Sequence, residues 1–331
     1  MKYLNLFVLL IVLTVSVSIN TGCPVPTTTT IYIDSAAMAD VPDITNFPMG
    51  WVGLEMPVYH EGGSLVDSGI SEPVHIVPSI KGFKMGKYCV TFELMRTVGN
   101  WAGANGYTIR EYMKGDTNPV SKYDSTVNYK YDPVALVSWQ DCIVWCNAYS
   151  EKEGLTPCYT YKGELMRDSL IEINSGIVIC NWDADGYRLP TEAEWEAAAR
   201  YIDGKEWTPG DFASGSKGDF KTESTYDFVV NWGFSVGQSV GTRNPNQLGI
   251  YDMSGQVWEW CWDRYSAYTM SSPHTDSDPK VDSTSEMSCV VRGGIDHYNK
   301  CYYQSAFRGY MGYYVSSLEI GFRVVRRERE K

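Results

Sequence analysis

The sequence predicts an α+β fold with little regular secondary structure, in which a few capped helices flank small sheets of short strands and long loops. Three observations support this prediction. The 331-residue chain contains 11 Trp, 24 Tyr and 30 Gly, a composition that indicates a loop-rich fold rather than a helical bundle. With 44% hydrophobic and 21% charged residues, the chain can bury a core. Clear helix-start signals occur at only three places, and the remainder reads as short strands and turns without internal repeats.

The composition also excludes several classes of function. The chain carries 28 Lys and Arg against 40 Asp and Glu, a net charge of −12, whereas a nucleic-acid binder needs a basic face. The four histidines lie far apart in sequence, which argues against an HExxH zinc motif and against a His-rich metal centre. We therefore expect neither a nucleic-acid partner nor a nucleotide cofactor.

The N-terminus has the pattern of an export signal. Residues 4–17 form an uncharged, mostly apolar run, and Gly22-Cys23 resembles the end of a bacterial lipobox, although Asn20 stands where Leu is usual. We expect a lipoprotein signal peptide at residues 1–22 and an acylated Cys23 followed by a tether, together residues 23–46, that anchor the chain at the outer membrane or cell surface of a bacterium. An ordinary signal peptide and an uncleaved anchor are the alternatives.

Eight further cysteines make an even number, which permits disulfides in an exported chain without revealing their connectivity. They are Cys89, Cys142, Cys146, Cys158, Cys180, Cys261, Cys289 and Cys301. Because the chain has no CxxC motif, a zinc ribbon or a thioredoxin-type site is not expected. We expect most of these cysteines to pack as small hydrophobic residues.

A continuous domain is expected over residues 47–327, and it begins with strands. Residues 72–78 have the pattern of an edge strand interrupted by prolines, and residues 83–90 that of a second strand. Thr91 is positioned to cap a helix that starts at Phe92.

Two stronger helix signals follow. Ser138 and Asp141 open a helix that should stop at Gly154. Thr191 and Glu194 form a capping box on another.

Five sequence blocks line up with a known family. They are PVALVSWQDC at 133–142, GYRLPTEAEWEAAAR at 186–200, PNQLGIYDMSGQVWEW at 245–260, VRGG at 291–294 and IGFR at 320–323. In this order they resemble the formylglycine-generating-enzyme/sulfatase-modifying domain. The resemblance implies a variant of the C-type lectin fold.

The same blocks make sense as scaffold. Arg188 with Glu192 or Glu196 is expected to hold a loop to a helix. Trp195, Trp258 and Trp260 are expected to supply buried area where secondary structure is sparse.

The resemblance does not extend to the family's oxidase chemistry. The oxidases bind copper through two cysteines five positions apart, shortly after the RGG strand, and soft thiolates are the ligands that Cu(I) needs. Here the matching stretch contains a single cysteine, Cys301, and Cys289 lies before the RGG. The iron-dependent branch uses histidines of an added domain that this chain lacks. We therefore expect no copper and no enzymatic activity.

The resemblance does imply a structural calcium site beside the GQVWEW turn. Its ligands would be the side chains of Asp252 and Glu259 and the carbonyls of Gly255 and Val257. Carboxylates with backbone oxygens suit a hard cation. The alternative is that both carboxylates only form hydrogen bonds within the loop.

The segment 295–319 differs in composition from the rest of the chain. Six tyrosines fall in the 17 residues from Tyr298 to Tyr314, among Ser, Gly, Asn, His and Asp. Rigid amphipathic rings next to adaptable hydrogen-bonding residues are typical of antibody paratopes. An exposed segment of this kind predicts a binding face. The alternative is that the tyrosines pack into the core.

This segment also resembles the variable region of proteins diversified by retroelements, which use the same C-type lectin variant. In that system, randomised adenines turn AAY codons into a characteristic set of residues. The residues that fit this set are the predicted ligand-binding positions Ile295, Asp296, His297, Tyr298, Tyr302, Tyr303, Phe307, Gly309, Tyr310, Gly312, Tyr313, Tyr314, Ser316, Ser317 and Leu318. Ala306 and Arg308 between them are expected to be fixed scaffold.

The sequence thus favours a non-enzymatic, lipid-anchored surface protein of the receptor or adhesin type. Its C-terminal segment would bind an extracellular ligand, in the first place a protein or another macromolecule. A structural envelope lipoprotein built on the same domain is the first alternative, and a formylglycine-type oxidase is the second.

Overall fold

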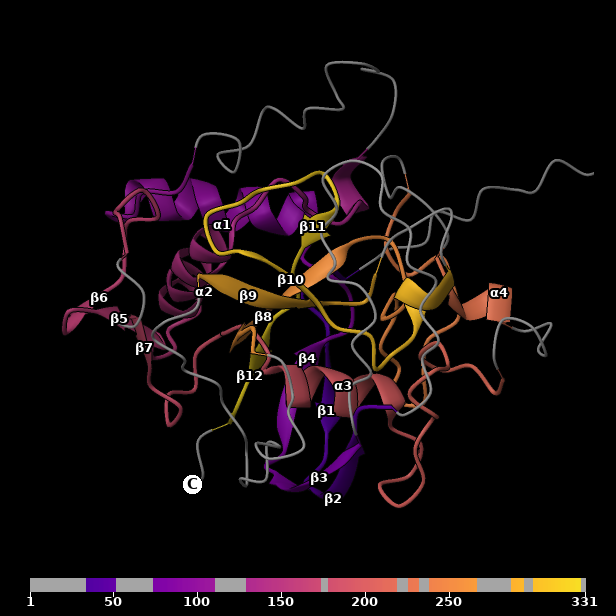
Figure 1. Ribbon diagram of the computed structural model, residues 1–331. Helices are drawn as coiled ribbons and strands as arrows, with labels where there is room; N and C mark the ends of the chain where they lie inside the picture. Colours follow the sequence, from indigo (N-terminus) through magenta and orange to yellow (C-terminus); the bar gives the residue numbers. More distant parts are fainter. Residues whose placement is uncertain are drawn as a thin grey trace, which may run out of the picture. The chain divides into compact units, whose positions relative to one another are not determined.

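The computed structural model describes residues 34–51, 74–110, 129–173, 178–218, 226–231, 238–266, 287–294 and 300–328. Short elements separated by long connections make up this part of the chain (Figure 1). The helices are α1 (Phe92–Ala104), α2 (Trp139–Lys152), α3 (Glu192–Arg200) and α4 (Tyr226–Val229), with 3-10 turns η2 (Tyr129–Tyr131) and η3 (Lys300–Tyr303). The predicted α+β fold is confirmed.

The strands form four small sheets. The largest has the order β10-β9-β8-β11 and consists of β8 (Trp258–Arg264), β9 (Ser288–Arg292), β10 (Gly309–Gly312) and β11 (Ile320–Gly321). A second contains β1 (Met38–Val41), β4 (Phe83–Gly86) and β12 (Val325–Arg326) in the order β1-β4-β12. A third pairs β2 (Ile44–Met49) with β3 (His75–Ile80). The fourth has the order β6-β5-β7 and contains β5 (Tyr159–Tyr161), β6 (Glu164–Leu165) and β7 (Val178–Cys180).

The helix starts follow the predicted caps. The side chain of Thr91 accepts from the Leu94 N–H at the start of α1. Complete capping boxes open α2, from Ser138, and α3, from Thr191. Because each cap satisfies an otherwise unpaired N–H, the boundaries were readable from sequence. The predicted stop at Gly154 is also confirmed, since this glycine has a φ of 73° just after α2.

The predicted tether ends too late in the chain. β1 pairs antiparallel with β4, and β2 pairs antiparallel with β3, so residues 38–46 belong to the folded domain. Their burial alternates, with Val41 and Ile44 buried, because these short strands place apolar side chains in the core. The predicted strand 72–78 is observed as β3, and the predicted strand 83–90 is shorter, ending at Gly86.

The four-stranded sheet separates two hydrophobic clusters. On one face Trp258, Trp260 and Trp262 join the cluster that contains α1 and α2. On the other face Cys261 and Val290 join the cluster that contains α3. Figure 1 shows α3 between the four-stranded sheet and the β2–β3 pair. The predicted burial of the tryptophans is confirmed, with Trp195 and Trp260 fully buried and Trp258 2% exposed.

Among the described residues, no helix is both long and apolar enough to cross a bilayer.

Candidate functional site

Helix α3 carries three buried carboxylates on which the C-terminal segment rests. The side chains of Glu192, Glu194 and Glu196 are each at most 1% exposed. A buried carboxylate is tolerated only when paired and hydrogen-bonded, and each of these acids has an arginine partner. The arginines come from different segments of the chain, so α3 links regions that are distant in sequence.

The prediction that Arg188 pairs with Glu192 or Glu196 is wrong. Its guanidinium donates to both oxygens of Glu194, at 2.7 and 2.6 Å, rather than to Glu192 or Glu196. The physical reason lies in the capping box. The Glu194 carboxylate turns back to accept the Thr191 N–H, which directs it toward the segment that precedes the helix. Despite burial, the net effect of Arg188 and these hydrogen bonds is to lower the pKa of Glu194.

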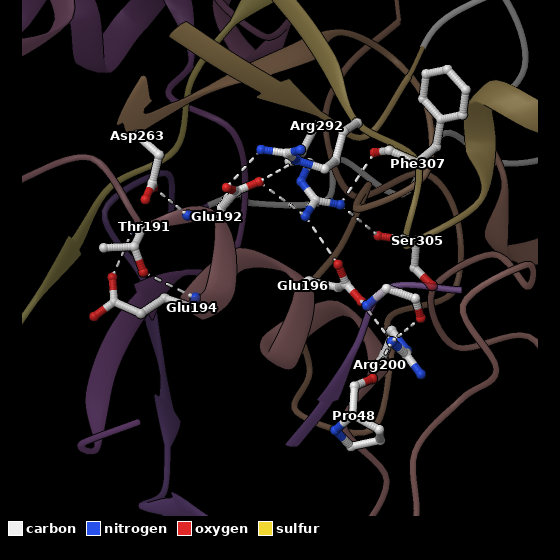
Figure 2. Close-up of polar contacts among 12 residues, drawn as sticks. Pro48, Thr191, Glu192, Glu194, Glu196, Arg200, Asp263, Arg292, Ser305 and Phe307 are labelled. Atoms are coloured by element: carbon white, nitrogen blue, oxygen red, sulfur yellow. Dashed lines mark hydrogen bonds and ion pairs between the residues drawn. The ribbon is translucent and has the colours of Figure 1, made fainter. Parts of the chain in front are cut away.

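Arg292 and Arg308 join the C-terminal segment to α3. Arg308 binds both oxygens of Glu192, at 2.6 and 2.9 Å. Arg292 donates to Glu196 at 2.9 Å and to the carbonyls of Ser305 and Phe307 at 3.4 and 3.2 Å (Figure 2). Buried bidentate arginines combine charge with directional hydrogen bonds, so they fix the path of the chain around residues 305–308.

The scaffold predicted beneath the binding face is confirmed. Arg292, Phe322 and Arg323 are fully buried, and Gly293, Gly294 and Gly321 are buried as well. Within the candidate segment, Ala306 and Arg308 are also buried, as expected of fixed positions. Gly294 shows why no side chain is possible there, since a Cβ atom would lie 1.8 Å from the Tyr302 carbonyl oxygen.

The prediction that the aromatic residues of this segment gather on one exposed surface is wrong for three of them. Tyr303 is fully buried beside Ala213 and Val230. Phe307 is 4% exposed, and its ring centroid lies 5.8 Å from that of Trp258. Tyr313 is 9% exposed and donates its hydroxyl to the Ile173 carbonyl. With so little regular secondary structure, the fold uses these rings as core.

Gly309 is also unsuitable as a variable ligand position. A Cβ atom there would lie 2.9 Å from Cγ2 of Val291 and 3.1 Å from the ring of Trp258. The close approach arises because β10 pairs Gly309 with Val291 of β9. The absence of a side chain is therefore a packing requirement at this position.

The remaining described positions of the segment reach the surface. Tyr314 is 55% and Leu318 39% exposed, while Tyr302, Tyr310, Gly312, Ser316 and Ser317 are partly exposed. Along β10 the outward residues are Tyr310 and Gly312, as strand alternation requires. The predicted positions Ile295, Asp296, His297 and Tyr298 lie outside the described residues, as does Cys23.

Two residues outside the predicted segment adjoin this surface. Tyr265 lies against Tyr310, with ring centroids 4.3 Å apart. Met287 is 53% exposed, and its carbonyl accepts the Tyr313 N–H. Sequence reasoning missed both because they lie before the RGG motif. The pairing of β8 with β9 and of β9 with β10 brings them to the segment. We use the name C-terminal face for the exposed or partly exposed side chains of Tyr310, Tyr314, Leu318 and Met287, of which Leu318 lies next to β11, at the opposite edge of the sheet from β10.

Glu259 does not fit the predicted calcium site. Both of its oxygens bind the Arg323 guanidinium, at 2.6 and 2.7 Å. The same carboxylate accepts from the Trp195 indole at 2.7 Å and from the Cys89 thiol at 3.0 Å. A cation at this carboxylate would lie beside a guanidinium charge, which disfavours the role predicted for Glu259 as a ligand. The residue instead joins β8 to the GFR block.

Asp252 lies in a different environment. Its carboxylate accepts the Gly241 N–H at 2.6 Å and contacts the Asn231 amide nitrogen at 3.4 Å. Burial raises the pKa of Asp252 to about 6. Nearby, the amide oxygens of Asn231 and Gln256 are buried and have no hydrogen-bond partner within the part of the chain that the structure describes. No group of three or more His, Cys, Asp and Glu side chains suited to a metal occurs among those residues either.

The thiols around the sheet are embedded in the core. Arg264 donates to the sulfur of Cys289 at 3.0 Å, and burial raises the pKa of that thiol to about 12. Cys289 is therefore part of the core packing beside Arg264. The side chain of Cys301 falls outside the described residues.

The sequence and the fold are both similar to those of known proteins. The profile of the sulfatase-modifying factor enzyme 1-like domain matches residues 47–328. Among solved structures, Treponema denticola variable protein 1 is similar, with a TM-score of 0.61 and 24% identity over 88% of this chain and 95% of the other. A likeness at this identity concerns the fold, and it confirms the expected C-type lectin variant.

Curated relatives match over shorter stretches. The chaperone protein LppX of Paenibacillus barcinonensis is 37% identical over 150 residues, which cover 40% of this chain and 52% of the relative. The formylglycine-generating enzyme of Thermomonospora curvata is 36% identical over 132 residues, or 37% of this chain and 41% of the enzyme. The matched part thus spans about half of these relatives or less. Since the domain profile covers most of the sequence, the chain belongs to the family of sulfatase-modifying factor enzyme 1-like domains.

Proposed function

We propose that the chain is a non-enzymatic, lipid-anchored surface protein that binds an extracellular protein through its C-terminal face. A single observation carries this proposal. The C-terminal segment combines anchors fixed in the core with aromatic and apolar side chains that reach the surface. Arg308 and Phe307 are buried, whereas Tyr314 and Leu318 are among the large exposed residues. Exposed aromatic side chains on a backbone held by buried anchors lose little conformational entropy when a ligand binds.

The choice of a protein ligand rests on the chemistry of this face. Tyrosine rings supply large contact area with a polar hydroxyl, and such residues dominate the energetics of protein interfaces. The relative named as a chaperone supports a binding function. Asp296, His297, Tyr298 and Ile295 are proposed to extend the face, and acylated Cys23 to anchor the chain in the membrane.

An array of purified extracellular proteins and glycans would test the proposal with the full-length chain. We expect wild-type protein to bind protein spots, and the triple variant Tyr310→Ser, Tyr314→Ser, Leu318→Ser to lose that binding at least tenfold. The matched control replaces three other exposed apolar residues, Ile76, Ile202 and Phe228, with Ser and should bind as wild type does. Equal binding by the triple variant, or binding to glycans alone, would contradict the proposal.

We further propose that any structural calcium is held at Asp252 rather than at Glu259. The carbonyls of Gly255 and Val257 and the amide oxygens of Asn231 and Gln256 would complete an oxygen ligand set, which is what calcium prefers. Calorimetric titration with calcium should give a binding isotherm that Asp252→Asn abolishes. A flat titration of the wild-type chain would overturn this assignment.

A further inference from the structure

Two cysteines of the small β6-β5-β7 sheet lie next to each other in space. Cys158 immediately precedes β5, and Cys180 is the last residue of β7. The strands pair antiparallel with Tyr159 opposite Cys180, and the Asn181 N–H donates to the Cys158 carbonyl at 2.7 Å. Cys158 is thus one position diagonal from Cys180 across this ladder. A strand spacing of about 4.8 Å and a rise of about 3.4 Å per residue place the two Cα atoms roughly 6 Å apart, within the range that a disulfide spans.

The two side chains also face each other. Both residues belong to the same hydrophobic cluster, with Cys158 fully buried and Cys180 6% exposed. The Cys158 thiol donates to the Gly186 carbonyl at 3.4 Å, and the neighbouring Cys180 is the largest cause of the lowered pKa of Cys158. Cys158 lies just before β5 and Cys180 is the last residue of β7, so strict alternation of faces does not apply to this pair. The pair therefore meets the two geometric conditions for a cross-link, which are backbone proximity and converging side chains.

Cys158 differs chemically from the other buried cysteines. Burial raises the pKa of Cys89, Cys142, Cys146 and Cys261 well above the ordinary value. The pKa of Cys158 is instead lowered, first by the contact with Cys180 and further by the charge of Arg188. Because the thiolate is the nucleophile in disulfide exchange, Cys158 should be the attacking cysteine once an opening of the fold gives the oxidant access to its buried sulfur.

We propose that Cys158 and Cys180 are a modification site that an external disulfide oxidant converts to an intramolecular disulfide. The Cys158 thiolate attacks one sulfur of the oxidant, a glutathione-type disulfide or an oxidoreductase disulfide, and one thiol leaves. The Cys180 thiol then gives up its proton and attacks the Cys158 sulfur of the mixed disulfide, which releases the second thiol. Two protein thiols and one disulfide thus become one protein disulfide and two thiols.

The cross-link would join the residue before β5 to the last residue of β7. It joins the ends of a connection that includes β6, and it lies next to Arg188, which pairs with Glu194 of α3. Constraining a loop of this length stabilises the folded state mainly by reducing the entropy of the unfolded chain. We expect a rise of the melting temperature on the order of 5 °C on oxidation.

Peptide mapping of the full-length chain tests the proposal directly. After equilibration with reduced and oxidised glutathione, non-reducing digestion and mass spectrometry should find the Cys158 and Cys180 peptides joined, with the joined species lost on reduction. Cys180→Ala should abolish the cross-link and the rise in melting temperature. Cys146→Ala, a matched buried cysteine on α2, should retain both.

Each result of the peptide map and of the melting experiments either supports or contradicts the Cys158–Cys180 cross-link. A joined Cys158–Cys180 peptide supports the proposal even if a variant fails to fold, because the wild-type map is independent of the variants. Peptides that pair Cys158 with Cys146, or two unlinked thiols after oxidation of the wild type, would overturn it. Retention of the thermal shift in Cys180→Ala would assign the effect to another pair.

Discussion

Buried charges show how single residues take on structural roles in this chain. Glu259 accepts hydrogen bonds from Arg323, Trp195 and Cys89, which lie in three separate segments. Desolvating a carboxylate is costly unless its partners compensate, so the whole set must be present together. The residue that the family resemblance assigned to calcium is thus the centre of a network of protein side chains.

Removing this carboxylate should be costly whether or not calcium is present. Glu259→Ala leaves the Arg323 guanidinium buried without its counter-charge, and we expect a loss of about 3–5 kcal/mol in the free energy of unfolding. Urea unfolding in calcium and in EDTA should give the same loss. The control Glu93→Ala removes a surface ion pair with Arg96 and should cost about 0–1 kcal/mol. A loss confined to the calcium-containing buffer would restore Glu259 as a ligand.

Burial also divides the aromatic residues of the C-terminal segment. Phe307→Ser empties core space beside Trp258 and should cost about 3–5 kcal/mol. Tyr314→Ser alters an exposed side chain and should stay within about 0.5 kcal/mol. Chemical denaturation of the two variants measures both values. Comparable costs would mean that the segment is uniformly core and that it offers no binding face.

At the scale of elements, β8 illustrates a limit of pattern analysis. Its sequence WEWCWDR alternates aromatic with mostly polar residues, a pattern typical of a strand with one solvated face. Every residue of the strand is nevertheless buried. The alternate face is covered by α3, where Asp263 accepts the Glu192 N–H and Glu259 meets Trp195. Polar residues on this strand therefore serve helix–sheet contacts.

Strand β10 allows a matched test of two glycines. A Cβ atom on Gly309 would meet Val291 and Trp258 in the core, whereas one on Gly312 would lie 3.2 Å from Tyr314, an exposed side chain that can move. Gly309→Ala should lower the melting temperature by several degrees through overpacking, and Gly312→Ala should leave it nearly unchanged. Thermal unfolding of both variants checks this, and a reversed order would show that β10 faces the other way.

At the scale of the whole molecule, lipid anchoring is a prediction about the N-terminus. We expect the mature chain to begin at an acylated Cys23, because the apolar run and the Gly22-Cys23 junction resemble a lipobox. Mass spectrometry of membrane-extracted protein should find a diacylated or triacylated N-terminal peptide. Cys23→Ala should leave the chain unacylated and release it from the membrane fraction after cleavage. An unmodified Cys23 thiol, or cleavage elsewhere, would contradict the prediction.

The proposed lack of oxidase activity is also a property of the whole domain. The copper-binding pair of the oxidases has no counterpart after the RGG block, and Cys289 lies before that block and is buried. Purified chain reconstituted with copper should not convert a cysteine-containing sulfatase peptide to formylglycine, as measured by peptide mass. Conversion at a rate above the no-enzyme control would show that the chain is an enzyme.

The sequence alone determined the local features of this protein. Helix starts at Thr91, Ser138 and Thr191 were readable because a cap is a contact between residues three positions apart. The motif blocks identified the family, and their tryptophans identified much of the core. These features depend on short-range chemistry or on residue type, which the sequence displays directly.

Only the tertiary structure decided which residues meet across the chain. It paired Arg188 with Glu194 and Arg323 with Glu259, and it placed Tyr303 and Phe307 in the core while leaving Tyr314 exposed. In a segment with neither strand nor helix periodicity, no sequence pattern marks the buried side. The burial of each tyrosine then depends on which distant helix or strand covers it, and that is settled by packing rather than by local sequence.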